Sequence, residues 1–232
     1  MNYAIFLLFC NYLGTIAFAI SGVLKGIRHR LDVLGLTLLA IITACGGGII
    51  RDLLVNEIPD ALVNPESLYL SIFTAGIIFI FTSKIRKNIK ISNIKKKKIY
   101  KILNIINLIS DSIGLSIFAI IGAEKSVNLE MNIITTGILA ALTGVGGGII
   151  RDLLVNEIPI VLKEDIYAFL AFAIGIVYHI LITELELPKI NVTVILFGIS
   201  LITRLIVIKY RINLPTVIRK SDNYNQNKLE KK

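Results

Sequence analysis

Cysteine and histidine are scarce in this sequence, which has two of each among its 232 residues. Cys10 and Cys45 both fall inside long apolar stretches, where nothing pairs them as a disulfide and small apolar packing residues are expected. His29 lies in a basic segment and His179 in an apolar one, with no Cys, Asp or Glu at metal-ligand spacing from either. The sequence therefore predicts no metal site and no cofactor. It also holds no catalytic set of the kind that soluble enzymes use, so we do not expect an enzyme.

The patterning of a soluble domain is missing as well. Hydrophobic residues make up 55% of the chain and the mean hydropathy is +0.77, which is too high for an ordinary soluble protein. The apolar residues form blocks near the ~20 residues that a helix needs to cross a bilayer. Seven blocks are predicted to span the membrane: residues 4–23, 33–55, 68–83, 102–122, 132–155, 166–183 and 190–208. The first lacks the basic segment that opens a signal peptide, so we interpret it as a retained span.

The net charge of +9 is distributed very unevenly over the loops between these blocks. Twenty Lys and Arg residues fall on one set of alternate loops, including nine in residues 84–101 and seven in the tail from 209 to 232. The opposite loops hold only Lys125 and Lys189. The positive-inside rule then places the N-terminus outside and the C-terminus in the cytoplasm of a multi-pass protein of the bacterial inner membrane. We expect the basic loop and tail to attract anionic lipid rather than nucleic acid.

An internal duplication organises the chain. The stretch GGGIIRDLLVNEIP occurs at residues 46–59 and again at 146–159, and many flanking positions also match at this offset of 100 residues. Each copy, residues 4–83 and 102–183, contains three spans, and residues 84–101 form a basic linker. Because three is odd, the second copy enters the membrane from the opposite side. The predicted fold class is therefore an all-α polytopic membrane protein with two inverted three-helix repeats, a seventh helix at 190–208 and a basic tail at 209–232.

The duplicated motif places glycines and charges inside two predicted spans. Three consecutive glycines weaken a helical turn, so a kink, an unwound turn or a close helix contact is expected there. Glycine as a small packing residue is the plain alternative. The candidate residues of a pore or substrate path are Gly46, Gly47, Gly48, Arg51, Asp52, Asp111, Gly146, Gly147, Gly148, Arg151 and Asp152.

The charged residues leave several readings open. Adjacent helix positions point about 100° apart, so Arg51 and Asp52 are not expected simply to neutralise each other. The arginines either line two mouths of one path, whose half-helices end at the following prolines, or snorkel to the membrane surface. Asp111 is a candidate helix N-cap, arginine partner or cation ligand. Lys25 and Lys125 are candidate gating residues or interfacial anchors, and Arg204 requires a partner that the sequence does not reveal.

These motifs resemble a family of bacterial membrane proteins with two copies of a glycine-transporter domain, which is similar to the trimeric intracellular cation (TRIC) channels. The resemblance rests on GGGIIRD in both copies and on the spacing of Asp111, Gly114, Phe118, Gly122 and Lys125. It implies a homotrimer with a pore in each protomer, bent at the glycines of the second and fifth helices, and potassium as the ion. The chain departs from its own repeat at Asn11, the counterpart of Asp111. The hypothesis is a TRIC-like potassium channel, and the alternative is a transporter of glycine or another small zwitterionic amino acid.

Overall fold

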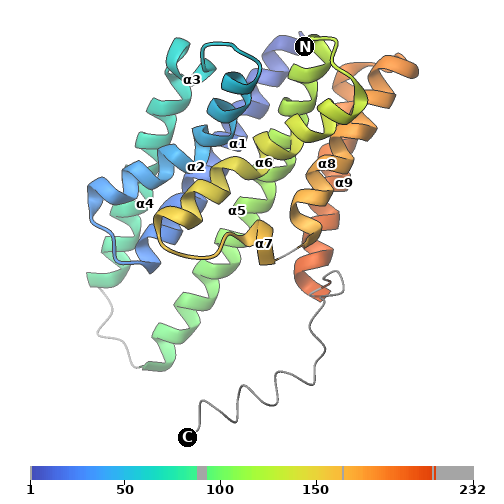
Figure 1. Ribbon diagram of the computed structural model, residues 1–232. Helices are drawn as coiled ribbons and strands as arrows, with labels where there is room; N and C mark the ends of the chain where they lie inside the picture. The colour runs from blue at the N-terminus through green and yellow to red at the C-terminus, as the bar shows by residue number, and fades with distance from the viewer. Residues whose placement is uncertain (1, 88–92, 164, 211, 213–232) are drawn as a thin grey trace, which may run out of the picture.

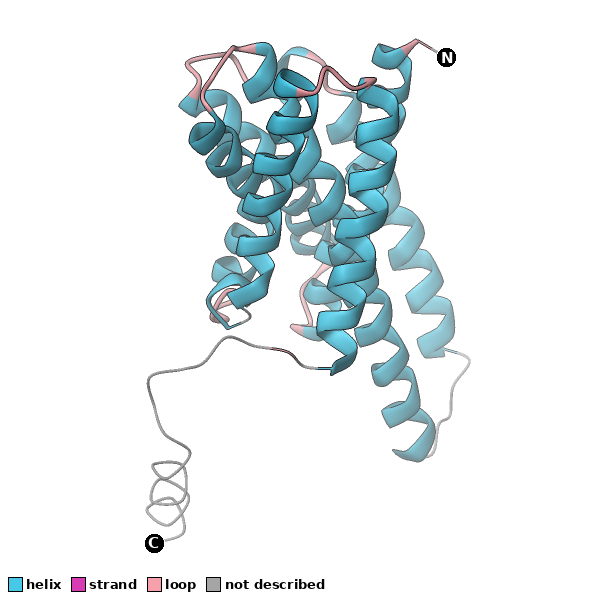
Figure 2. Ribbon diagram, turned by 90° about the vertical axis from the view of Figure 1, so that its right-hand side faces the viewer, coloured by secondary structure: helices cyan, strands magenta, loops and turns pink. Residues whose placement is uncertain are grey.

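The computed structural model describes residues 2–87, 93–163, 165–210 and 212, and within these ranges it is entirely helical. Seven helices are long and apolar enough to cross a membrane. They run side by side through the bundle (Figures 1 and 2). Their bounds are α1 Tyr3–Arg28, α2 Val33–Leu54, α4 Glu66–Lys87, α5 Asn93–Asn128, α6 Ile133–Leu154, α8 Asp165–His179 with its continuation η1 Ile180–Glu184, and α9 Lys189–Tyr210. All seven predicted spans are confirmed.

The two repeats begin and end their second helices in the same way. Asp32 accepts a hydrogen bond from Gly35 N at 2.8 Å before α2, and its counterpart Asn132 accepts one from Thr135 N at 2.9 Å before α6. Such side-chain caps satisfy backbone donors that a helix start leaves free. After each helix an asparagine adopts a left-handed backbone conformation, with φ of 60° at Asn56 and 55° at Asn156. The short helices α3 (Asp60–Val63) and α7 (Ile160–Lys163) follow and lie at opposite ends of the bundle (Figure 1).

The helices α1, α2, α5 and α6 form the centre of the bundle. Helix α4 packs on α1 and α2, while α8 packs on the corresponding α5 and α6. Helix α9, which lies outside the duplication, covers α5 and α8. At the contact between α1 and α5, the rings of Phe18 and its counterpart Phe118 stack with centroids 5.3 Å apart. The matched positions of the two repeats thus meet each other.

Several boundaries differ from those expected. Helix α4 continues to Lys87 and α5 begins at Asn93, so helix covers much of the segment predicted as a loop at 84–101. Residues 88–92 and most of the basic tail lie outside the described residues. The prediction that these segments attract anionic lipid therefore falls outside the part of the chain that the structure describes. Helix α8 ends in a π-helical turn, whose hydrogen-bond spacing the sequence pattern did not indicate.

Of the outcomes expected at the triple glycines, the unwound turn is wrong. Both α2 and α6 are continuous α-helix through Gly46–Gly48 and Gly146–Gly148. They end at Leu54 and Leu154, several residues before the prolines that were expected to end them. Of the three outcomes considered for the glycines, the structure contains the close helix contact.

Candidate functional site

Helices α2 and α6 cross at their glycine triplets. A methyl group added to Gly47 would overlap the carbonyl oxygen of Thr143, and one added to Gly147 would overlap the carbonyl oxygen of Thr43. A Cβ at Gly146 would lie 3.1 Å from the Cα of Gly47. The backbones therefore touch at the centre of the bundle, where only glycine leaves enough space.

The third glycine of each triplet lies beside the guanidinium group of the arginine one turn later. A Cβ at Gly48 would lie 3.9 Å from Nη2 of Arg51, and one at Gly148 would lie 3.7 Å from Nη2 of Arg151. Each guanidinium group thus folds back along its own helix toward a position without a side chain.

Both arginines bind the aspartate that follows them, contrary to the expectation that adjacent helix positions diverge. The Nε–H of Arg51 donates to Asp52 at 2.7 Å, and that of Arg151 donates to Asp152 at 3.0 Å. Arg51 is 5% exposed and Arg151 0%, so neither snorkels to the membrane surface. A buried arginine of this kind is stabilised by its ion pair and hydrogen bonds rather than by water.

The two aspartates also hold the turns that follow the helices. The second oxygen of Asp52 accepts the backbone N–H of Asp60 at 2.9 Å, and that of Asp152 accepts the backbone N–H of Ile160 at 3.0 Å. Each carboxylate thus fixes the start of α3 or α7. Asp52 and Asp152, predicted as residues of a path, have a clear structural role in these turns.

The remaining partners of the two arginines differ between the repeats. Arg51 reaches Asp60 at 3.1 Å, and the Asp60 side chain is 64% exposed. Arg151 instead donates through Nη1 to Asp111 at 2.8 Å and to Ser21 at 2.6 Å. Asp111 is 1% exposed and, of the three roles considered for it, has that of an arginine partner here. The first arginine is therefore paired at the rim of the bundle and the second in its interior.

Lys25 and Lys125 each bind a glutamate of the other repeat. Lys25 Nζ lies 2.8 Å from Glu157 and 3.1 Å from Asp152, and Lys125 Nζ is hydrogen-bonded to Glu57. Lys25 is 5% exposed, so it is not an interfacial anchor. These reciprocal ion pairs, like the reciprocal glycine contacts, are those that a two-fold relation between the repeats would produce.

The ion pairs of Glu157 lower its pKa. Lys25 donates to one carboxylate oxygen, and the His29 ring lies 2.6 Å from the other. The hydrogen bond from Lys25 is the largest cause and the one with His29 adds to it, bringing the pKa of Glu157 from 4.5 to about 2. The glutamate therefore stays ionised at neutral pH and ties α1 to the turn after α6.

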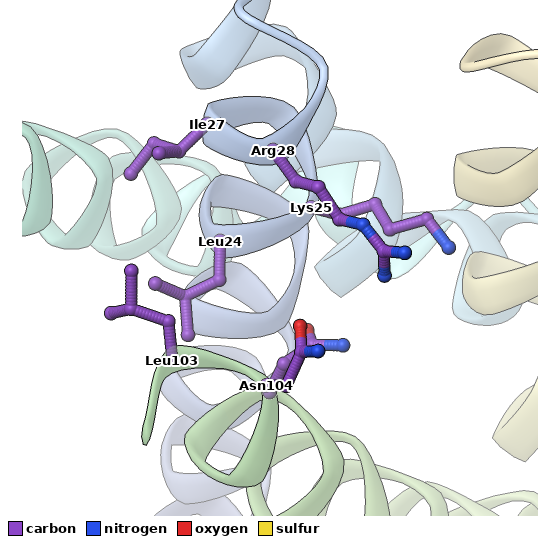
Figure 3. Close-up of a pocket in the computed structure, with 7 residues that line it drawn as sticks. Leu24, Lys25, Ile27, Arg28, Leu103 and Asn104 are labelled. Atoms are coloured by element: carbon purple, nitrogen blue, oxygen red, sulfur yellow. The ribbon is translucent and has the colours of Figure 1, made fainter. Parts of the chain in front are cut away.

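A cavity of about 220 Å³ opens between α1 and α5, near this ion-pair cluster. Figure 3 shows an apolar side, with Leu24, Ile27 and Leu103, and a polar side, with Lys25, Arg28 and Asn104. A molecule of liquid water occupies about 30 Å³, so the cavity has room for several. The seventh lining residue, Asn107, accepts a hydrogen bond from Ser21 Oγ at 2.9 Å.

This hydrogen bond joins the cavity to the buried charges. From Asn107 the chain of contacts runs through Ser21 to Arg151 and on to Asp111, which also accepts the hydroxyl of Tyr167 at 2.7 Å. Polar side chains therefore form a continuous track from the cavity into the apolar bundle. Chemically, the track offers fixed charges and hydrogen-bonding groups to a small polar species.

Several of these residues were missed by sequence reasoning, and most differ between the two repeats. Comparing the two copies at their offset of 100 residues would have found these residues, because each corresponds to a residue of different polarity or size in the other copy. The pairs are Ser21 and Ile121, Asp60 and Ile160, Ser67 and Tyr167, and Leu7 and Asn107.

Comparison with known proteins places these features in a family. A family model described as glycine transporter matches residues 8–84 and 108–183, one segment in each repeat. The chain belongs to this family. The UPF0126 inner membrane protein YadS of Escherichia coli K12 is 32% identical over 207 residues, covering 89% of this chain and 93% of YadS. The UPF0126 membrane protein YvgT of Bacillus subtilis is 38% identical over 168 residues, covering 72% and 76%. This glycine transporter family member is accordingly a multi-pass protein of the bacterial inner membrane.

Solved structures share the fold over nearly the whole chain. A prokaryotic TRIC channel crystallised in 0.5 M KCl is 37% identical with a TM-score of 0.78, covering 92% of this chain and 100% of that one. A structure solved to explain conductance through TRIC cation channels is 33% identical with a TM-score of 0.75, covering 91% and 97%. The resemblance to TRIC proteins is thus confirmed. These relatives are membrane proteins and channels rather than enzymes, in agreement with the expectation for this family member.

Proposed function

We propose that this chain is a monovalent cation channel of the inner membrane that conducts potassium, with a separate path in each protomer of a homotrimer. The observation that carries the proposal is the buried polar track from Asn107 through Ser21 to Arg151 and Asp111. Polar and ionised groups are costly inside a bilayer and typically mark the route of an ion or substrate. The similarity to proteins described as TRIC cation channels supports the cation as the permeating species.

The path begins at the cavity between α1 and α5 and follows the polar track toward the crossing of α2 and α6. The crossing is its constriction, because the backbones touch at Gly47 and Gly147. Conduction requires the two helices to separate there, and glycine permits that motion because it presents no side chain on either helix. Beyond the crossing, the pair formed by Lys125 and Glu57 flanks the opposite mouth.

The proposal includes the orientation of the chain and its inverted repeats. The C-terminal end of α4, the start of α5 and the end of α9 lie at the same end of the bundle, opposite the N-terminus (Figure 1). The helix ends that border the predicted basic linker and tail lie at that end, which supports a cytoplasmic location. The reciprocal contacts of Lys25 with Glu157 and of Lys125 with Glu57 support the inversion. The similarity to a trimeric intracellular cation channel orthologue from Rhodobacter sphaeroides supports the homotrimer.

Transport of glycine or another small zwitterion is the second candidate function. The favouring observation is that Nη2 of Arg151, fully buried, has no hydrogen-bond partner among the described residues. A guanidinium donor of this kind suits a carboxylate, and neighbouring aspartates suit an ammonium group. The rest of that guanidinium is already bound by Asp111, Asp152 and Ser21, which leaves one nitrogen, with its two N–H groups, for a substrate.

Reconstitution separates the two functions. Purified protein in planar bilayers and in liposomes should give unitary potassium currents and no saturable uptake of labelled glycine. Empty liposomes and liposomes with an unrelated seven-helix protein are the controls. Saturable glycine uptake without unitary currents would overturn the channel in favour of a carrier.

A further inference from the structure

Two positions that correspond between the repeats are in contact in both of them, but the side chains there differ in charge. In the first repeat, Asn11 Nδ2 donates to Ser67 Oγ at 3.3 Å. In the second, the counterparts meet as the Tyr167 hydroxyl donating to Asp111 at 2.7 Å. A neutral contact between α1 and α4 thus corresponds to a charged one between α5 and α8. At this place the second repeat has a buried carboxylate and an aromatic ring, and the first has neither.

The ring of Tyr167 also connects to the helix outside the duplication. The guanidinium carbon of Arg204, on α9, lies 4.5 Å from the centroid of this ring. Arg204 is 1% exposed and Tyr167 2%. At this distance a cation is attracted to the negative face of an aromatic ring, most strongly where water is excluded. One turn earlier on α9, Ser200 donates to Ser116 of α5 at 2.8 Å and fixes the helix in place.

Charge compensation explains why the Asp111 carboxylate and the Arg204 guanidinium group occur together. Arg151 and Lys25 are balanced by Asp152 and Glu157, as Arg51 is balanced by Asp52 in the first repeat. Asp111 adds a negative charge to the second repeat, and Arg204 adds a positive charge behind the Tyr167 ring. Burying either one without the other would leave a net charge in the apolar interior, which is far costlier than burying both.

The arrangement also has a direction. Asp111 binds Arg151 of the polar track and the Tyr167 hydroxyl, whereas Arg204 lies over the ring of the tyrosine and comes from α9, which packs on α5 and α8. The added pair is therefore a dipole whose negative end faces the track. A fixed negative end at this point favours cations over anions in the half of the track that joins the cavity.

We propose that Arg204 is a positioning residue of the ion path: through the ring of Tyr167 it holds Asp111 as a fixed carboxylate that selects cations. The inference rests on the proposed channel function and deepens it. It gives the seventh helix, which the duplication leaves unexplained, a part in selectivity. It also makes the cavity-side half of the path more cation-selective than the half built by the first repeat.

The test measures reversal potentials in planar bilayers under a gradient of KCl, together with the melting temperature (Tm) of the purified protein. Arg204→Gln should lower the potassium-to-chloride permeability ratio several-fold and lower Tm. Arg204→Lys should keep most of the ratio, because the charge remains over the ring. Tyr167→Phe, which removes only the hydroxyl, should lower the ratio with a smaller loss of Tm. Ser200→Ala is the matched packing control on α9 and should change Tm while leaving the ratio at the wild-type value.

A double variant keeps the test decisive if Arg204→Gln alone does not fold. Asp111→Asn combined with Arg204→Gln removes both charges, so its Tm should exceed that of either single variant while its permeability ratio stays low. A double variant with wild-type selectivity, or an Arg204→Gln protein that loses Tm but keeps its reversal potential, would overturn the proposal. Wild-type protein without ion current would instead refute the channel function. Even without ion current, the Tm values test the link between Arg204 and Asp111: if the changes in Tm from Asp111→Asn and Arg204→Gln simply add in the double variant, the link is refuted.

Discussion

The backbone of Gly147 lies directly against the carbonyl oxygen of Thr43, at a separation that leaves no space for a single methyl group. The same relationship holds between Gly47 and Thr143. These contacts make the middle glycine of each triplet the tightest point of the α2–α6 crossing. They locate the duplicated glycines in helix packing and, under the proposed function, at the constriction of the path.

Replacing Gly147 with alanine should destabilise the protein. The added methyl group meets backbone rather than a flexible side chain, so α2 and α6 must separate, at a cost of about 1 to 3 kcal/mol. At about 2 to 4 °C per kcal/mol for a chain of this size, Tm in detergent should fall by several degrees. Gly198→Ala on α9 is the control, because a Cβ there meets nothing within 4 Å. That substitution should leave Tm unchanged or raise it slightly through helix propensity; equal losses in both variants would show that the crossing is not special.

The two repeated arginines should respond differently to the same substitution. Arg151→Gln leaves Asp111 and Asp152 without their shared cation in a buried site, where breaking an ion pair costs about 3 to 5 kcal/mol. Arg51→Gln should cost less, because it leaves one buried carboxylate, Asp52, without its cation, while its second partner Asp60 has a side chain that is 64% exposed and can be hydrated. Comparing the yield and Tm of the two purified variants measures the difference. Equal losses would mean that the asymmetry of their partners has no energetic consequence.

The spans and the duplication could be predicted from the sequence because both depend on local patterns. Blocks of apolar residues near bilayer length became the seven long helices, and the repeat offset identified which positions correspond. The helix breaks were predicted wrongly because the cost of glycine was judged for an isolated helix. In the bundle, the backbone contact that Gly47 and Gly147 permit offsets this cost, and the intrahelical hydrogen bonds remain.

The partners of the charged residues could not be predicted, because they come from distant parts of the chain. Lys25 meets Glu157 across 132 positions, and Arg151 meets Asp111 across 40. Helical periodicity describes one helix at a time and cannot give such contacts. Pairing between Arg151 and Asp152 was also missed, since the directions of adjacent positions do not account for a long side chain that folds back over a glycine.

Acid should weaken the ion pair between Lys25 and Glu157. The pKa of Glu157 is lowered from 4.5 to about 2 in the folded protein. A lowered pKa means that the folded state favours the ionised form, so the stabilisation is complete above pH 4.5 and is lost as the pH falls toward 2. Glu157→Gln should have a lower Tm than the wild type at pH 6, and the difference between the two proteins should narrow as the pH is lowered through this window. Glu130→Gln, at the exposed turn after α5, is the control. A difference in Tm that stays constant down to pH 2 would contradict the assigned ion pairs.

The inverted arrangement of the repeats can be tested at two positions with the same local sequence. Ile58 and Ile158 follow the same motif, and each is well exposed, at 71% and 62%. If the repeats are inverted, these side chains lie on opposite sides of the membrane. In a background with Cys10 and Cys45 replaced by alanine, a membrane-impermeant maleimide added to intact cells should label Ile58→Cys and not Ile158→Cys.

Opening the membrane should make both cysteines react, which controls for intrinsic reactivity. Labelling of both from outside would refute the inversion, whereas labelling of Ile158→Cys alone would keep the inversion and reverse the proposed orientation. The identical motif makes this comparison sharp, because only the side of the membrane distinguishes the two sites.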